Sequence, residues 1–293
     1  MTKPFLKWAG GKTQLLNTID AALPDGIGTS ITKYAEPFVG GGAVLFYLLD
    51  KYNITEAYIS DVNFELINAY VIIKEQLDEL LVMLEKMQEE YCSLSTENRK
   101  KYYYNMRNTF NKLKVKQEYS VKKAAYFIAL NKTCFNGLYR VNKKGEFNVP
   151  SGVYKNPKIY DAENLNAVSK LLQKVTIKCG NYNESKTFID NNTFVYFDPP
   201  YRPLSKTSSF TSYTNIPFND DEQIKLAKYV DYLSGIGAKV MVSNSDPKNT
   251  DKNDNFFDDL YKNYQIKRVS ASRMINRDGD SRGKINELLI TNY

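Results

Sequence analysis

The tetrapeptide Asp198-Pro199-Pro200-Tyr201 joins a carboxylate, two rigid residues and an aromatic ring, directly after the apolar run Phe194–Phe197. Such an uninterrupted run is typical of a strand that is buried on both faces in a parallel sheet. Proline cannot donate a ladder hydrogen bond, so we expect the strand to end at Asp198, where α/β sheets bind ligands. There the Asp198 carboxylate and the Pro199 carbonyl can accept both hydrogens of an amino group, while Tyr201 stacks on a planar ring. The simpler alternative is a strand-ending turn with a buried tyrosine.

A second candidate site is the glycine loop FVGGG at residues 38–42, which follows a predicted strand at residues 32–39 and opens a predicted helix. Glycines let a ligand approach the backbone, and a helix N-terminus offers unpaired N–H groups. Asp61 ends the next predicted strand, where an acidic residue accepts hydrogen bonds from ribose hydroxyls. Residues 43–45, Ala-Val-Leu, stand where a dinucleotide-binding loop has its third glycine, so the loop suits an adenosine ligand without phosphates. The alternative is a tight turn, with Asp61 only capping the following helix.

The composition excludes several kinds of site. The 293-residue chain contains no histidine, which rules out a Ser-His-Asp triad and removes the commonest general base and metal ligand. Cys92, Cys134 and Cys179 are isolated, so we predict no zinc or other metal site and no disulfide framework. The sequence has no apolar signal-peptide core and no run that could cross a bilayer, so we expect a cytoplasmic protein without a membrane partner. The net charge of +7 allows a polyanionic partner, although a merely basic surface explains it equally well.

Around these motifs the sequence predicts an α/β fold with a mostly parallel sheet and helices on both faces. Strands are expected at residues 32–39, 56–60, 175–180, 194–198, 238–245, 264–270 and 285–293. Helices are expected at residues 43–52, 64–91, 121–132, 220–235 and 253–264. Residues 138–142 and 146–150 flank a Lys-Lys-Gly turn and predict a β-hairpin. A helical, basic insertion at about residues 71–164 interrupts the sheet, and a charged loop at residues 272–284 separates the last two strands.

Six blocks in the order FLKWAGGK, EPFVGGGAV, SDVN, FNGLYRVN, GEFNVP and FDPPY resemble the Dam-like DNA adenine methyltransferases. The resemblance runs from Phe5 to Tyr293, and the FNGLYRVN and GEFNVP blocks are similar to the GATC-methylating branch. It implies S-adenosylmethionine as methyl donor, N6-methyladenine as product and double-stranded DNA as partner, in a bacterial or phage-infected cell and without an obligate protein partner. It also implies a seven-stranded Rossmann-like catalytic domain at residues 1–70 and 165–293, with a DNA target-recognition domain at residues 71–164.

The resemblance implies catalytic and cofactor roles for individual residues. The catalytic motif corresponds to Asp198, Pro199, Pro200 and Tyr201. Cofactor-contacting positions correspond to Trp8, Lys12, Phe38, Gly40, Gly42, Asp61, Asn181, Tyr182 and Asp198. At Asn181 several relatives carry an acid that receives the adenine amine of the cofactor, and the amide oxygen of Asn181 can still accept that bond. Two acceptors that grip the target amine can rotate its lone pair out of conjugation, and a base inside a duplex must be flipped out to reach them.

The resemblance also implies a set of DNA contacts in the insertion and near the N-terminus. Positions that touch the DNA site correspond to Lys7, Asn136, Leu138, Arg140, Pro150 and Tyr154, and Phe135 matches an aromatic position that wedges into the duplex. An arginine on a hairpin can read guanine in the major groove. A solvated helical face is the simpler interpretation of the lysines in the preceding basic stretch, which are Lys100, Lys101, Lys112, Lys114 and Lys116.

Three other functions remain as alternatives. A methyltransferase that acts on RNA or on a protein glutamine more often carries Asn before the prolines, and it would not need the insertion. A DNA-binding regulator that has lost its activity would have no need of an intact Asp198-Pro199-Pro200-Tyr201 motif. A nicotinamide-dependent oxidoreductase is disfavoured by the spacing of the glycines.

Overall fold

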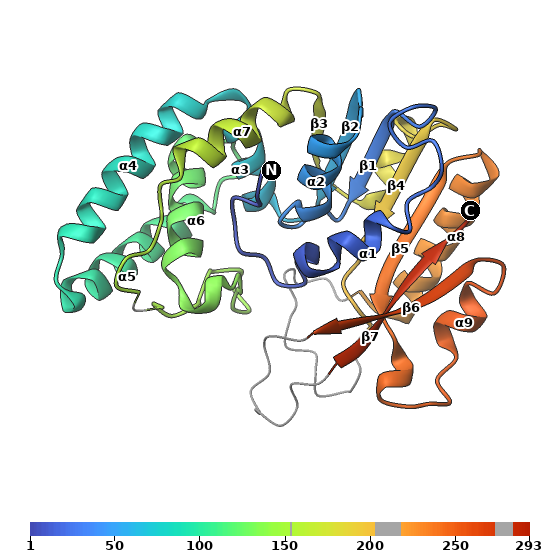
Figure 1. The fold of residues 1–293 in the computed structure, drawn as a ribbon. Coiled ribbons are helices and arrows are strands. Elements are labelled where there is room, and N and C mark those ends of the chain that lie inside the picture. The colour runs from blue at the N-terminus through green and yellow to red at the C-terminus, as the bar shows by residue number, and fades with distance from the viewer. Residues whose placement is uncertain (153, 203–217, 273–283) are drawn as a thin grey trace.

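The computed structural model describes residues 1–152, 154–202, 218–272 and 284–293, and Figure 1 shows a twisted sheet beside a helical part. The described strands form one seven-stranded sheet in the order β3-β2-β1-β4-β5-β7-β6. Pairing is parallel from β3 to β5, whereas β7 runs antiparallel to both of its neighbours. The predicted, mostly parallel α/β sheet is therefore confirmed. The strands are β1 Lys33–Pro37, β2 Glu56–Asp61, β3 Val175–Cys179, β4 Thr193–Phe197, β5 Lys239–Ser245, β6 Gln265–Ser272 and β7 Lys284–Thr291.

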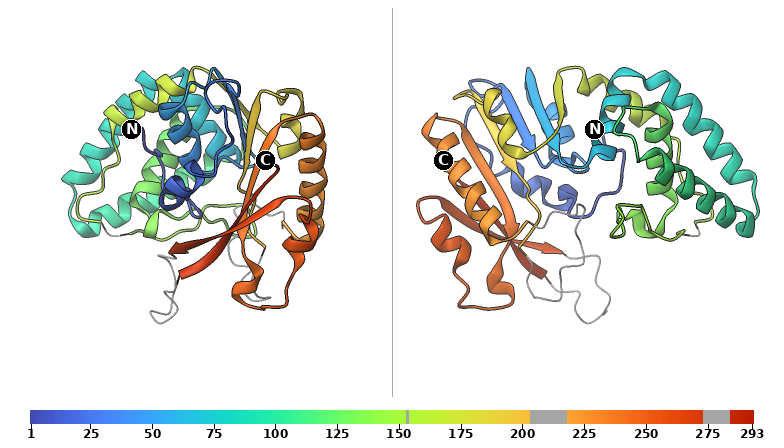
Figure 2. Two further views of the ribbon diagram at one scale, coloured as in Figure 1. Left: turned by 45° about the vertical axis from the view of Figure 1, so that its right-hand side comes forward. Right: turned by 180° about the vertical axis from the view of Figure 1, so that it is seen from behind.

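Helices cover both faces of the sheet, as the two further views in Figure 2 show. Successive side chains of a strand point to opposite faces, and every residue of β4 is buried. Phe194 and Tyr196 belong to a core shared with helices α1, α2 and α3, while Val195 and Phe197 pack with α8 and α9 on the other face. This two-sided burial explains the uninterrupted apolar run before Asp198. The helices are α1 Leu16–Asp20, α2 Ala43–Lys51, α3 Phe64–Glu75, α8 Asp220–Gly235 and α9 Phe256–Leu260.

The helical part packs against α3 through α4, α6 and α7, and α4 and α5 both pack on α6. It comprises α4 Leu77–Ser93, α5 Thr96–Leu113, α6 Val121–Thr133 and α7 Ala162–Leu172. The prediction of one helix over residues 64–91 is wrong, because the backbone turns at Gln76 (φ −136°, ψ 43°) between α3 and α4. The predicted domain boundaries fall within α3 and α7, and one apolar core continues across them. No helix in the described part of the chain is both long enough and apolar enough to span a membrane.

The predicted hairpin folds back on itself, but its arms are too short to count as strands. Val141 pairs with Phe147 as an isolated antiparallel bridge, the Asn142 amide donates to the Glu146 carbonyl at 2.9 Å, and the Asn148 amide donates to the Arg140 carbonyl at 3.0 Å. The pairing is therefore confirmed, whereas regular strands are not formed. Of the predicted charged loop, residues 273–283 lie outside the described residues.

Candidate active site

Asp198 lies immediately beyond β4, and both oxygens of its carboxylate accept hydrogen bonds. Lys12 Nζ donates to Oδ2 at 2.7 Å, and Ser243 Oγ donates to Oδ1 at 3.0 Å. The Lys12 side chain is only 5% exposed and also donates to the Gly10 carbonyl at 2.8 Å. Ser243 belongs to β5, whose parallel register with β4 pairs Phe197 with the residue just before Ser243. The sheet therefore fixes one side of the carboxylate and the N-terminal segment fixes the other.

Tyr201 is held at its hydroxyl and on its ring face. Its Oη donates to Glu287 Oε2 at 2.6 Å, and Lys12 Nζ lies over the ring at 4.8 Å from the centroid. Burial raises the pKa of Tyr201 well above its ordinary value, and the charges of Asp198 and Glu287 raise it further. The hydroxyl is therefore neutral and acts as a donor. The turn between Asp198 and Tyr201 is held as well, because Gln223 Nε2 donates to the Pro200 carbonyl at 3.1 Å.

A second carboxyl group lies buried near Asp198. Glu36, in β1, is 3% exposed, and its Oε2 accepts from Tyr34 Oη at 2.8 Å. Burial raises the pKa of Glu36 to about 8, with a further contribution from the Asp198 charge, while the Tyr34 hydrogen bond opposes the rise. Ser243 also shares a hydrogen bond of 3.0 Å with Tyr196 Oη. Asp198 is thus bound to the buried pair Ser243 and Tyr196, and a second buried pair, Glu36 and Tyr34, lies near it.

The glycine loop turns sharply at the carboxyl end of β1. Gly40 and Gly42 have positive φ values of 48° and 71°, and a Cβ on Gly42 would lie 2.5 Å from the Tyr70 hydroxyl oxygen. Asp61 binds this loop, since its Oδ2 accepts from the Gly40 amide at 3.3 Å and its Oδ1 from the Asn63 amide at 2.9 Å. Burial raises the pKa of Asp61 to about 6, against the lowering effect of the backbone N–H groups. The predicted loop and its acid are therefore adjacent in space.

Aromatic rings line the neighbouring strand ends. Phe38, which adopts a φ of 78°, lies 5.3 Å from the Tyr182 ring, measured between centroids. Trp8 stacks on Tyr139 at 5.6 Å with an interplanar angle of 23°, and a Cβ on Gly40 would lie 2.9 Å from Trp8 Cδ1. The residues assigned to the cofactor thus lie around the ends of β1, β2, β3 and β4, where the Lys12 ammonium is bound to Asp198.

Asn181 has a local partner of its own. Its side chain is exposed and accepts from the Asn183 amide at 3.3 Å, while its own amide donates to Glu184 Oε1 at 2.8 Å. This reciprocal pair is a capping box that begins the turn after β3. Its predicted contact with an adenine amine stays a prediction, as do the other cofactor assignments.

The residues assigned to DNA form a linked group at the hairpin and the N-terminal segment. Phe135 is 51% exposed, and its amide donates to the carbonyl of the exposed Pro150 at 2.9 Å. Asn136 has a φ of 55° and donates its amide to Tyr154 Oη at 3.1 Å. Lys7 Nζ lies over the Tyr154 ring at 5.5 Å from the centroid.

Two further residues belong to this group. Arg140 is exposed, and its Nε donates to Asn148 Oδ1 at 2.8 Å, so its guanidinium is held by a neutral side chain. Leu138 is half-buried beside it. Sequence reasoning missed Asn131, whose buried side chain binds the Lys7 amide, the Lys7 carbonyl and the Gly137 carbonyl at 2.9–3.0 Å. Asn131 therefore ties the N-terminal segment to Gly137, which lies between α6 and the hairpin.

Comparison with known proteins places the chain in a family. Residues 8–275 match the D12 class of N6 adenine-specific DNA methyltransferases. The chain belongs to this class. It is 55% identical over 293 residues to the type II methyltransferase M.MjaIII of Methanocaldococcus jannaschii, with 99% of each chain covered. It is 39% identical to the type II methyltransferase M1.LlaDCHI of Lactococcus lactis subsp. cremoris, covering 99% of this chain and 95% of the relative. It is 34% identical to the DNA adenine methylase of Escherichia coli K12, with coverages of 98% and 94%.

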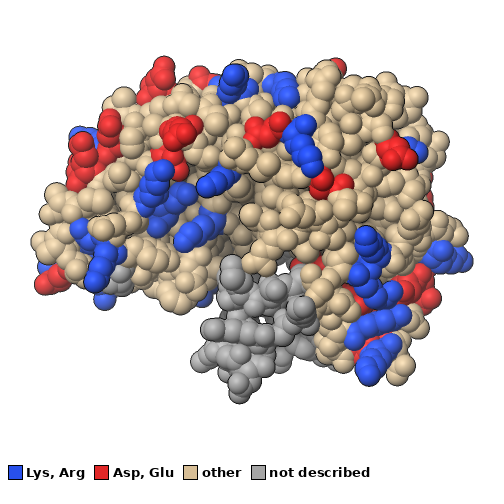
Figure 3. Space-filling model, viewed as in Figure 1, with Lys and Arg blue, Asp and Glu red and all other residues tan. Residues whose placement is uncertain are grey.

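Charge on this D12-class enzyme is unevenly distributed. Figure 3 shows Lys and Arg side chains gathered over the helical part and again over the C-terminal part of the face viewed. Lys100, Lys101 and Lys112 are exposed on α5, in agreement with a solvated helical face, whereas Lys116 is exposed but lies beyond the end of α5. That prediction is wrong for Lys114, which is half-buried and donates to Tyr139 Oη and to the Gly145 carbonyl, each at 2.9 Å. These two hydrogen bonds from Lys114 therefore help to hold the hairpin in place.

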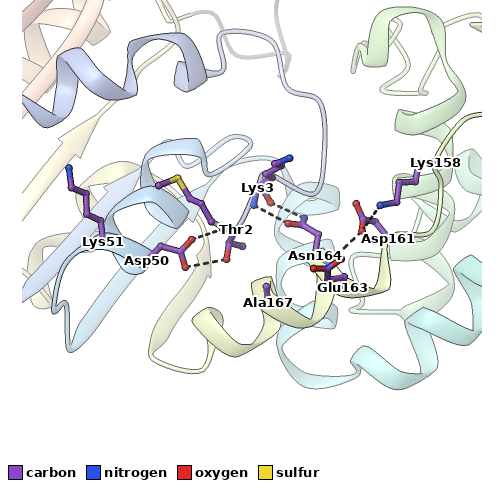
Figure 4. A pocket seen from close by; sticks show the side chains of 10 residues that line it. Thr2, Lys3, Asp50, Lys51, Lys158, Asp161, Glu163, Asn164 and Ala167 are labelled. Carbon is purple, nitrogen blue, oxygen red and sulfur yellow. Dashed lines mark hydrogen bonds and ion pairs between the residues drawn. The ribbon is translucent and has the colours of Figure 1, made fainter.

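A hollow of about 750 Å³ lies elsewhere on the enzyme, between the N-terminal residues, the end of α2 and the start of α7 (Figure 4). Several of its polar groups bind one another: Thr2 donates to Asp50, the backbone of Lys3 exchanges hydrogen bonds with the Asn164 side chain, and Lys158 pairs with Asp161. None of the residues assigned to catalysis, cofactor or DNA lines this hollow. We therefore assign this hollow no part in the reaction.

Proposed function

We propose that this chain transfers the methyl group of S-adenosylmethionine to the N6 amine of adenine within GATC, after flipping that adenine out of duplex DNA. One observation carries the proposal. The Asp198 carboxylate and the Tyr201 ring flank the same ammonium group at the end of β4, so a hydrogen-bond acceptor and a stacking surface lie side by side. A planar ring that bears an amino group can donate a hydrogen bond to this acceptor and stack on this surface.

The residues at the ends of β1 and β2 suit an adenosine-containing methyl donor. Gly40 and Gly42 adopt positive φ values, so the loop presents backbone without side chains. The Asp61 carboxylate lies against this loop and can accept from ribose hydroxyls, and the rings of Phe38 and Tyr182 offer apolar surface for a base. When bound, S-adenosylmethionine supplies a methyl group that its sulfonium has already activated.

The protein's part in the reaction is to position the amine. The carboxylate of Asp198, held on one side by Ser243, accepts one N6 hydrogen, and the carbonyl of Pro199 accepts the other. The proline ring fixes φ, which limits the movement of that carbonyl. With both hydrogens held, the lone pair turns out of the adenine plane. Because the donor is activated, positioning of this kind can supply much of the rate acceleration.

The DNA side of the proposal rests on the hairpin and its surroundings. Phe135 is a large, exposed aromatic residue that can enter the base stack, and the exposed guanidinium of Arg140 can bond to two acceptors of guanine. The FNGLYRVN and GEFNVP blocks support GATC as the site. The exposed lysines of the helical part add a sequence-independent attraction to phosphates.

A methylation assay tests the proposal. The chain is incubated with methyl-labelled S-adenosylmethionine and three duplexes, of which one contains GATC, one has a single base changed within GATC, and one has N6-methyladenine at both sites already. We expect label only on the first duplex and only at adenine N6, with Asp198→Ala as the inactive control. Equal labelling of the first two duplexes would refute GATC specificity, and label on cytosine or none at all would refute the reaction.

A further inference from the structure

Glu287 is the residue that binds the hydroxyl of Tyr201, although the two lie 86 positions apart in the chain. Its Oε2 accepts from Tyr201 Oη at 2.6 Å, a distance typical of a charge-assisted hydrogen bond. Glu287 is carried by β7, where it pairs with Ser245 of β5 on one side and Val269 of β6 on the other. Strands flank this carboxylate on both sides, so its position is fixed by the sheet.

The hydrogen bond restrains the ring that the proposed reaction uses. A tyrosine side chain turns about two bonds, and a bond at the hydroxyl fixes the far end of the ring while the backbone fixes the near end. Burial, Asp198 and Glu287 all raise the pKa of Tyr201, so its hydroxyl keeps its proton and remains a donor over any ordinary assay pH. The ring plane is thereby set before a base arrives, which lowers the entropic cost of stacking.

We infer that Glu287 is a positioning residue, which holds the Tyr201 ring in the plane needed to stack on the flipped adenine. The inference rests on the function proposed above and adds a residue to it. Glu287 acts through the Tyr201 hydroxyl and does not itself touch the base. It explains why a stacking position carries tyrosine: the ring face serves the base, and the hydroxyl anchors the ring to β7.

A purely structural role for Glu287 makes a different prediction. If the carboxylate only stabilised β7, its removal would lower the stability of the sheet whether or not residue 201 carried a hydroxyl. If it acts through Tyr201, its removal has no further effect once that hydroxyl is gone. The two roles are therefore separated by a double-mutant cycle between Glu287→Ala and Tyr201→Phe.

The cycle uses the full chain and GATC duplexes. We expect Glu287→Ala and Tyr201→Phe each to lower kcat/KM by about tenfold, the loss of one charge-assisted hydrogen bond, and the double variant to be no worse than either. Glu287→Gln retains an acceptor oxygen and should lose less. Affinity for S-adenosylmethionine should stay within about twofold of wild type, because Glu287 binds the tyrosine and not the glycine loop. Glu56→Ala, an exposed strand glutamate in β2, is the matched control and should change nothing.

A second readout follows the ring itself. 2-Aminopurine at the target position becomes fluorescent when it leaves the duplex stack and is quenched again when it stacks on an aromatic ring. We expect less quenching by Glu287→Ala and Tyr201→Phe than by wild type. Losses that multiply in the double variant, or wild-type quenching in Glu287→Ala, overturn the inference. If Glu287→Ala fails to fold, Glu287→Gln completes the cycle. An inactive wild type overturns the proposed function, and the inference with it; an active wild type with multiplying losses overturns the inference alone.

Discussion

Replacing Asp198 by alanine should damage both the reaction and the stability of the fold, and a second substitution should separate the two effects. The substitution removes the carboxylate partner of the Lys12 ammonium, which lies 2.7 Å from Asp198 Oδ2 on a side chain that is 5% exposed. Removing one partner of a buried pair costs about 3–5 kcal/mol, and removing one partner of an exposed pair costs about 0–1 kcal/mol. The Asp198 side chain is 20% exposed and Lys12 keeps its bond to the Gly10 carbonyl, so we expect a loss of about 2 kcal/mol.

That loss should lower the melting temperature by about 3 °C for a chain of this size. Lys12→Met added to Asp198→Ala removes the stranded charge and fills its volume, so most of the lost stability should return while methylation stays absent. Calorimetric melting and a methylation assay on the same samples measure the two effects. Glu222→Ala breaks the exposed pair with Lys225, whose side chain is 64% exposed, and should change the melting temperature little.

Two results would refute this reasoning. An unchanged melting temperature in Asp198→Ala would mean that the Lys12 ammonium is not held by Asp198 in solution. Recovery of methylation in the double variant would mean that the carboxylate does not act on the amine. If, instead, Lys12→Met alone weakens binding of S-adenosylmethionine without changing stability, Lys12 contacts the cofactor, as the resemblance implies.

Asp61→Ala should weaken binding of S-adenosylmethionine by about 1–3 kcal/mol in calorimetry. Because the pKa of Asp61 is raised to about 6, wild-type affinity should also fall as the pH drops through 6, and Asp61→Asn should lose that dependence. Arg140→Ala should cost about 1–3 kcal/mol of discrimination at one guanine of GATC. Lys112→Ala should instead weaken the binding of all duplexes equally. Equal losses on every sequence from Arg140→Ala would mean that Arg140 contacts a phosphate. Glu36 is protonated in the fold up to a pKa of about 8 but ionises near pH 4 when unfolded, so the folded state binds the extra proton between these values. Its contribution to stability therefore falls as the pH rises through that window, and Glu36→Gln should flatten the fall in a denaturation series.

The parts of the site that the sequence predicts are those whose chemistry lies in neighbouring residues. Strand, acid and proline stand together at Asp198, and strand, glycines and helix stand together at residues 38–42, so each local structure follows from local rules. Ser243 and Glu287 were missed because their roles depend on the order and register of β4, β5 and β7. One indication was available for Ser243: residues 243–245 are polar at the carboxyl end of an otherwise apolar predicted strand, and all three are buried.

The fold shows the same division between local and distant causes. No glycine or proline marks the break at Gln76, and the helical spacing of apolar residues continues on both sides of it. The pattern alone therefore predicts one helix. The hairpin turn was predicted from Lys-Lys-Gly, and Gly145 has the expected positive φ of 77°. The short arms could not be predicted, because backbone groups of the hairpin are bound by a distant residue: the Asn111 side chain binds both backbone groups of Phe147, at 2.8 and 3.0 Å.

Residues 7–12, the N-terminal segment, lie far in sequence from the other motifs of the site. Their contacts nevertheless bring them to the same site. Lys7 is bound by Asn131 and lies over Tyr154, and Lys12 holds the carboxylate of Asp198. Between them Trp8 packs on Tyr139 of the hairpin and against the glycine loop. The backbone of residues 7–12 therefore joins side chains that contact the hairpin to the side chain that contacts Asp198, and Trp8 contacts the glycine loop between them.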